Sequence, residues 1–210
     1  MTSNMSSLIA YNGYPNVFSV DSKPYGLLYS DWCVRWVKWL LEQPMESNPA
    51  IDTTGKNCAQ NQNGSVWFLA GTFGGSATRK CNIPPGKAIL FPVIEKECSF
   101  VEDKDLKFEM ELIARTTKFM NSVTHLELFI DGIIVRNLNK YHVQTPVFDL
   151  IFPRNNVYEV EEGITRSTCG GFWIFLEPLP TGDHKIYFRG TDPDFNTEVT
   201  YYLIVGEERG

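Results

Sequence analysis

The chain has 210 residues, of which 43% are hydrophobic and 21% charged, and its formal net charge is −6. This acidic balance, with Lys and Arg scattered along the chain, argues against nucleic-acid binding, which needs a basic surface. No apolar run approaches the roughly 20 residues of a membrane helix, and residues 1–7 lack the pattern of a secretory signal, so we expect a cytoplasmic protein with no membrane contact.

The first elements in chain order are an arm and a helix. Residues 1–24 carry turn residues and few apolar patterns, which predicts an extended N-terminal arm. A helix near residues 30–42 follows, with Ser30 placed to cap its start and Pro44 to end it. One stripe of this helix carries Trp32, Trp36 and Trp39. We interpret the stripe as the face that docks on a sheet; the alternative is that the rings bind a sugar or a cation.

Loops and short strands follow the helix. Residues 48–64 form a long polar segment, residues 66–69 a short strand, and residues 71–76 a glycine-rich turn that matches no phosphate-binding motif. The apolar run 88–94 contains Pro92, which favours an edge strand or a bulge.

A second helix is predicted near residues 104–120, with acidic residues in its first turn. Its apolar face would carry Leu106, Met110, Ile113 and Met120.

The second half of the chain reads as consecutive short strands separated by turns. Asp131-Gly132 between two apolar runs is typical of a two-residue hairpin. We therefore predict a mainly β fold, an antiparallel β-sandwich of immunoglobulin-like or jelly-roll type with one or two packed helices. Residues 25–206 would form this single domain.

Glu95 and Glu97 are the candidate chemical groups. Strand alternation places both carboxylates on one side of their strand, where they could act as an acid/base pair. His142 would complete a site for a divalent metal if the fold brought it to these carboxylates. The competing interpretation is a solvated strand end with an ordinary salt bridge, and no other cofactor is evident.

The five cysteines contain no C-x-x-C pair, which argues against zinc-ribbon and thioredoxin sites. Reduced, buried thiols are one interpretation. The alternative is a disulfide between Cys58 and Cys81, which would close the polar segment between them.

Several rare residues follow in an order that resembles an uncharacterised family of bacterial and archaeal proteins. The similarity runs from Tyr25-Gly26 and the tryptophan helix through the segment V-W-F-L-A-G-T at 66–72 to Gly171-Phe172-Trp173. It implies homology over residues 25–205 and no known activity.

We predict a non-enzymatic protein that binds a small molecule or a protein partner through segments 48–64 and 71–76. The expected aromatic contacts are Trp32, Trp36, Trp39, Trp67, Phe73 and Trp173. The alternatives are a metal-dependent or hydrolase-type enzyme using Glu95, Glu97 and His142, and a structural subunit that associates with itself or with other chains.

Overall fold

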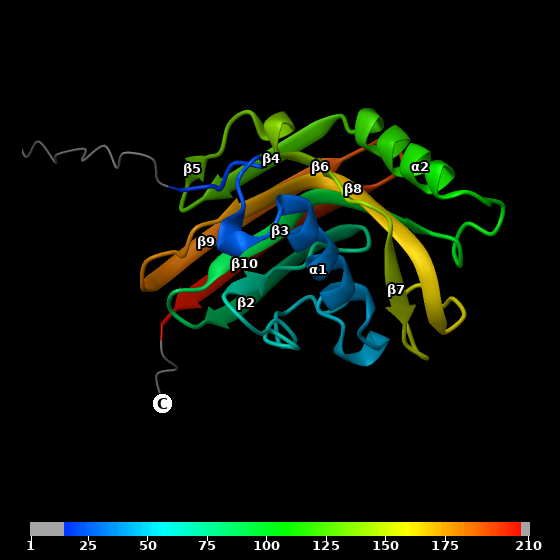
Figure 1. Cartoon of the computed structure of the whole chain (residues 1–210). Coiled ribbons are helices and arrows are strands. Elements are labelled where there is room, and N and C mark those ends of the chain that lie inside the picture. Colours follow the sequence, from blue (N-terminus) through cyan, green and yellow to red (C-terminus); the bar gives the residue numbers. More distant parts are fainter. Residues whose placement is uncertain (1–14, 207–210) are drawn as a thin grey trace, which may run out of the picture.

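The computed structural model describes residues 15–206, which are mainly β with two α-helices, as predicted (Figure 1). The helices are α1 (Tyr29–Leu41) and α2 (Glu109–Ser122), with short 3-10 turns at Pro24–Gly26, Met45–Ser47 and Leu138–Tyr141. The strands are β1 (Val66–Phe68), β2 (Gly75–Ile83), β3 (Ala88–Ser99), β4 (His125–Ile130), β5 (Ile133–Ile134), β6 (His142–Gln144), β7 (Phe148–Phe152), β8 (Gly163–Leu176), β9 (Gly182–Thr191) and β10 (Asn196–Val205). Of the predicted arm, residues 1–14 lie outside the described part, and Val17 forms one bridge to Leu176.

The strands form two five-stranded sheets. Sheet A has the order β1-β3-β8-β6, with β7 also paired to β8, and sheet B has the order β2-β10-β9-β4-β5. Both sheets are mixed, because β1 pairs in parallel with β3 and β2 pairs in parallel with β10. The prediction of purely antiparallel pairing is wrong at these two contacts. Turn signals identify neighbours joined by hairpins, whereas parallel partners are joined by long crossovers that leave no local signal.

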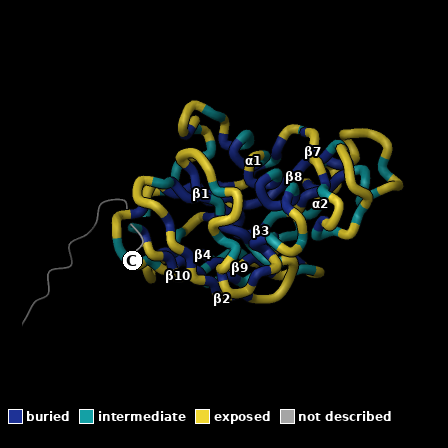
Figure 2. Tube along the Cα trace, turned by 90° about the horizontal axis from the view of Figure 1, so that it is seen from below, coloured by how far each residue is buried: buried dark blue, intermediate teal, exposed yellow. Residues whose placement is uncertain are grey.

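The facing sides of the two sheets share one hydrophobic cluster. Phe91 and Ile174 contribute from sheet A, and Phe188 and Tyr201 from sheet B. The rings of Phe91 and Phe188 stack with centroids 5.0 Å apart. The buried trace in Figure 2 runs through this interior, while the turns around it are exposed.

Helix α1 packs against the outer face of sheet A, where the ring centroid of Trp36 lies 5.1 Å from that of Trp173. The helix begins one residue earlier than predicted. The backbone N–H of Leu28 donates to the Asp31 carboxylate at 3.1 Å, so Asp31 rather than Ser30 satisfies the start of the helix. Among residues 15–206, no helix is long and apolar enough to cross a membrane.

Helix α2 begins at Glu109, about five residues later than predicted. The carboxylate of Glu111 accepts the backbone N–H of Phe108 at 2.8 Å, which fixes the first turn. The predicted apolar face is wrong at Met110, which is 77% exposed, and confirmed at Met120, which is buried. The buried face carries Leu112, Thr116 and Met120.

The predicted hairpin at Asp131-Gly132 is present between β4 and β5. Asp131 has φ of 51° and Gly132 has φ of 78°, as a two-residue hairpin turn with both central residues left-handed requires.

Strand β3 lies between β1 and β8 in sheet A, but Pro92 comes after the last residue paired with β1, so the prediction of an edge strand or a bulge is confirmed at the proline. The ladder to β8 shifts register between Pro92 and Ile94, and the proline is accommodated in the predicted bulge. On its other side β3 pairs with β1 only along Ala88–Leu90. Beyond Leu90 this edge of β3 has no partner strand among the described residues, and the candidate site lies there.

Candidate ligand-binding cavity

Glu95 and Glu97 lie on the same face of β3, as alternation predicts. Glu95 stands opposite Gly171 of β8, and Glu97 stands opposite Cys169. A Cβ at position 171 would lie 2.7 Å from the Glu95 Cβ, so only glycine leaves room for this carboxylate. Small side chains on β8 therefore make space for two acids within the layer.

The carboxyl group of Glu97 is 2% exposed. Ser167 donates its hydroxyl to Glu97 Oε1, and Glu97 Oε2 has no donor among the described residues. Burial raises the pKa of Glu97 well above its usual range, and the negative charge of the neighbouring Glu102 carboxyl adds to the shift. Glu97 therefore ionises less readily than an exposed glutamate.

Glu95 is bound by the neighbouring thiol. Cys169 donates to Glu95 Oε2 with the sulfur 3.1 Å from the oxygen. Burial raises the pKa of Glu95, although this bond opposes the shift. Burial, followed by the charge of Glu95, raises the pKa of Cys169 well above its usual range. The thiol therefore stays protonated and acts as a donor, and it is a poor candidate for a nucleophile.

Tyr158 reaches the acids from the turn between β7 and β8. The side chain of Asn156 closes this turn, accepting the Tyr158 backbone N–H at 3.2 Å and donating to Val160 O at 2.8 Å. Burial, followed by the negative charge of Glu97, raises the pKa of Tyr158 well above its usual range, so its hydroxyl remains a donor. The ring meets Phe73 edge to face at 5.7 Å between centroids.

These groups border a cavity of about 350 Å³ along the open edge of β3. A loop of sheet B supplies another wall, where Asp192 accepts the backbone N–H groups of Asp194 and Phe195, both at 2.7 Å. This turn sets the position of the Phe195 ring. The aromatic walls are Phe73, Phe119, Tyr158 and Phe195. The charged lining residues are five acids and one base: Glu95, Glu97, Glu102, Asp192, Asp194 and Lys96.

His142 does not join the two glutamates. It pairs with Phe172 of β8, which in turn pairs with Ile94, so its side chain lies on the face of sheet A opposite Glu95. Residue 142 is also exposed. Within residues 15–206 no three His, Cys, Asp or Glu side chains are arranged to hold a metal ion. The predicted three-residue metal set is therefore not assembled.

The predicted aromatic binding residues divide into two groups. All five tryptophans are buried, and Trp36, 1% exposed, donates its indole N–H to Leu69 O at 2.9 Å. Trp67 belongs to the cluster between the sheets, and Trp173 to the cluster under α1. Phe73 is 44% exposed and borders the cavity. The ring stripe of α1 is thus a packing face.

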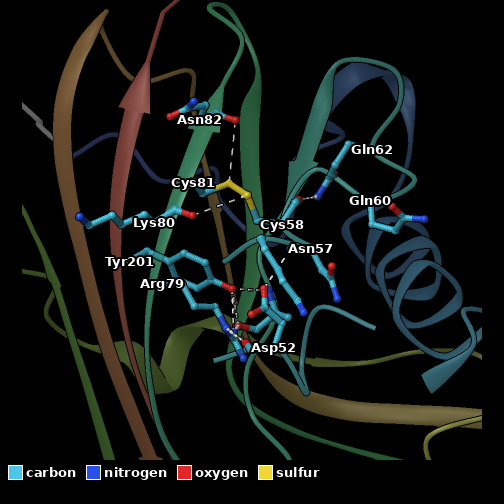
Figure 3. Close-up of a disulfide and its surroundings, with 12 residues drawn as sticks. Asp52, Asn57, Cys58, Gln60, Gln62, Arg79, Lys80, Cys81, Asn82 and Tyr201 are labelled. Atoms are coloured by element: carbon cyan, nitrogen blue, oxygen red, sulfur yellow. Dashed lines mark hydrogen bonds between the residues drawn. A yellow bond between two sulfur atoms is a disulfide. The ribbon is translucent and has the colours of Figure 1, made fainter. Parts of the chain in front are cut away.

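A disulfide between Cys58 and Cys81 fastens the polar segment 48–64 to β2 (Figure 3). Beside it, the buried Arg79 guanidinium donates to the backbone carbonyls of Asp52 at 2.7 Å and Ala70 at 2.7 Å. These contacts fix the backbone immediately before Phe73. The bridge requires oxidising conditions, whereas the cytoplasmic location expected from the sequence is a reducing environment.

Sequence reasoning identified Glu95, Glu97 and Phe73 but missed the residues that complete the cavity. Glu102 follows β3 by three residues, whereas Phe119, Tyr158 and Phe195 come from segments distant in the chain, and only the short turn signal at Asp192 precedes one of them. No family model, curated protein or solved structure matches this chain, so the site is argued from its geometry alone.

Proposed function

We propose that this protein is a β-sandwich whose sheets support a binding site for a small organic cation in the cavity beside Glu95 and Glu97. The observation that carries the proposal is the combination of five acidic side chains with four aromatic ones around about 350 Å³. Carboxylates attract a protonated or quaternary amine, and aromatic faces attract the same charge through their quadrupoles. The volume is at the lower end of small-molecule sites.

The buried glutamates support a cationic ligand more than a neutral one. Burial and their mutual repulsion keep Glu95 and Glu97 from ionising readily when the cavity holds no positive charge. A bound cation would stabilise the ionised carboxylates. A neutral ligand of the same shape would not offset the free-energy cost of ionising these carboxyl groups.

The experiment compares choline with its uncharged isostere 3,3-dimethylbutan-1-ol by isothermal titration calorimetry. We expect choline to bind at least about tenfold more tightly than the alcohol, a difference of roughly 1.4 kcal/mol. Equal affinity for the two compounds, or binding of neither, would contradict the proposal.

Glu95→Gln should weaken choline binding about tenfold, because it removes a charge from the cavity while keeping the side-chain shape. Glu177→Gln is the matched control, since Glu177 is exposed and does not border the cavity. Equal losses in the two variants would show that the cavity charge does not govern binding.

A second candidate function is acid–base catalysis in the same cavity, the hydrolase-type alternative. One observation favours it: Glu97, whose pKa is raised by burial, borders the same cavity as Glu102, an arrangement suited to a general acid beside a base. Consumption of a bound compound, abolished in Glu97→Gln, would support this function over simple binding.

A further inference from the structure

A second hollow, the α1 groove, lies between helix α1 and the polar segment that follows it. Its volume is about 450 Å³, and it shares no lining residue with the acidic cavity. Its lining includes Trp32, Arg35, Lys38, Gln43, Asn61 and Asn63.

Two hydrogen bonds and a disulfide hold the polar segment that forms the outer wall of the α1 groove. The indole N–H of Trp39 donates to Gln60 O at 2.9 Å, and the Gln62 amide donates to Cys58 O at 3.0 Å. Cys58 is in turn joined to Cys81 of β2, as Figure 3 shows. The groove is therefore preformed, which reduces the entropy cost of binding a ligand.

The α1 groove carries two basic side chains that form no ion pair with any of residues 15–206. Arg35 lies with its guanidinium carbon 4.8 Å from the Trp32 ring centroid, and no carboxylate in residues 15–206 pairs with it. Lys38 likewise has no ion-pair partner in that range. The one acid at the groove, Glu42, accepts the Ile151 backbone N–H at 3.2 Å.

Three side-chain amides at the α1 groove also have hydrogen-bonding atoms without a partner among the described residues. The side-chain amides of Asn61 and Asn63 bond to nothing within the described residues. Gln43 is 2% exposed; its amide N–H donates to Trp39 O, while its Oε1 has no donor in the described part of the chain. A buried acceptor without a donor is costly, and a ligand hydroxyl at the base of the groove would remove that cost.

We propose that the α1 groove is a second binding site, for a saccharide that carries a carboxylate. Arg35 and Lys38 would bind the carboxylate, as guanidinium and ammonium groups commonly do. The amides of Asn61 and Asn63 would bond to ring hydroxyls.

An acidic peptide is the less suitable occupant. A peptide that adds a strand needs a free sheet edge, and β1 is the edge of sheet A beside the groove. Gln62 already occupies that edge, accepting the Phe68 N–H at 3.0 Å and donating to Phe68 O at 2.8 Å. Side-chain amides arranged around a closed volume suit hydroxyl groups instead.

The test titrates digalacturonate into the oxidised full-length protein and follows calorimetric heat and tryptophan fluorescence. We expect binding at a Kd below about 1 mM, at least about tenfold tighter than for the neutral disaccharide of galactose. Absence of binding, or equal affinity for the neutral disaccharide, overturns the proposal. Tighter binding of tetraglutamate than of digalacturonate overturns it in favour of a peptide.

Two variants locate the site. Arg35→Gln should weaken digalacturonate binding about tenfold, whereas Arg154→Gln, at an exposed arginine outside the groove, should leave it unchanged. Asn61→Asp should weaken binding further, since it adds a negative charge and aspartate accepts the left-handed backbone at this position, φ 51°. Unchanged affinity in Arg35→Gln and in Asn61→Asp would show that digalacturonate binds outside the α1 groove. Choline binding should be unaffected, so the two proposals fail independently.

Discussion

The two faces of sheet A differ in how they are covered, and the candidate site follows from that difference. The face toward sheet B is apolar on β3 as far as Ile94, with Phe91, Val93 and Ile174 fully buried. Beyond Ile94 this face carries Lys96, which pairs with Gly170 of β8, and Met120 of α2 packs there. The outer face begins in the same way, with Trp173 beneath α1, but further along it carries Glu95 and Glu97. Sheet B and α2 together cover the inner face, whereas α1 covers only part of the outer face. The uncovered part can hold polar groups at the edge of the core.

The largest expected effect comes from a substitution in the part of the outer face that α1 covers. Trp36→Ala should lower the free energy of unfolding by about 3 to 5 kcal/mol, because it empties a fully buried ring site. Phe73→Ala is the matched control at the half-exposed cavity wall and should cost about 1 kcal/mol or less. Urea denaturation measures both. A Trp36→Ala loss close to that of Phe73→Ala would contradict the core assignment of the helix stripe.

The next effect concerns the disulfide that holds segment 48–64. Cys58→Ser together with Cys81→Ser should lower the free energy of unfolding by about 3 kcal/mol, since the bridge closes a loop of 23 residues in the unfolded chain. Denaturation with and without reductant checks this, and reductant should have no effect on the double variant. Titration of the unfolded wild type should detect three thiols, those of the free cysteines Cys33, Cys98 and Cys169. Five thiols in protein purified without reductant would rule the bridge out.

Substituting two glycines, one on the outer face of sheet A and one between the sheets, compares the two faces directly. A Cβ at Gly171 would meet Glu95 on the outer face at 2.7 Å, and one at Gly190 would meet Ile94 between the sheets at 2.4 Å. Both alanine variants should lose about 1 to 3 kcal/mol of stability through overpacking. Only Gly171→Ala should also weaken choline binding, because it displaces a carboxylate of the cavity. Equal effects on binding would mean that the cavity is not where choline sits.

The smallest effect is a pH dependence. The folded pKa of Glu97 is raised above the unfolded value of about 4.3, so its stabilising contribution is complete below that pH and is lost as the pH rises through the folded pKa. Glu97→Gln does not titrate. The variant should therefore gain stability relative to wild type between pH 4 and pH 8.

Denaturation midpoints at the two pH values measure this change, with Glu177→Gln as the control. A difference between Glu97→Gln and wild type that does not change with pH would mean that Glu97 is ionised in the folded protein.

Much of the site on β3 was predictable because it depends on one strand. Alternation alone places Glu95 and Glu97 together, and the same rule separates His142 from them once the two ladders are known. The position of Tyr158 was not predictable in this way. It depends on how the turn after β7 folds over β3, and that turn is held by the internal bonds of Asn156.

The sequence by itself determined the mainly β character, helix α1 and the turn at Asp131-Gly132, since these follow from periodicity and local backbone preference. Only the tertiary structure decided the parallel pairs, the place of β3 between β1 and β8, and the meeting of Glu97 with Tyr158. Such contacts join segments whose relative position is set by register and packing over the whole core. A local pattern carries no record of which distant strand will lie beside it.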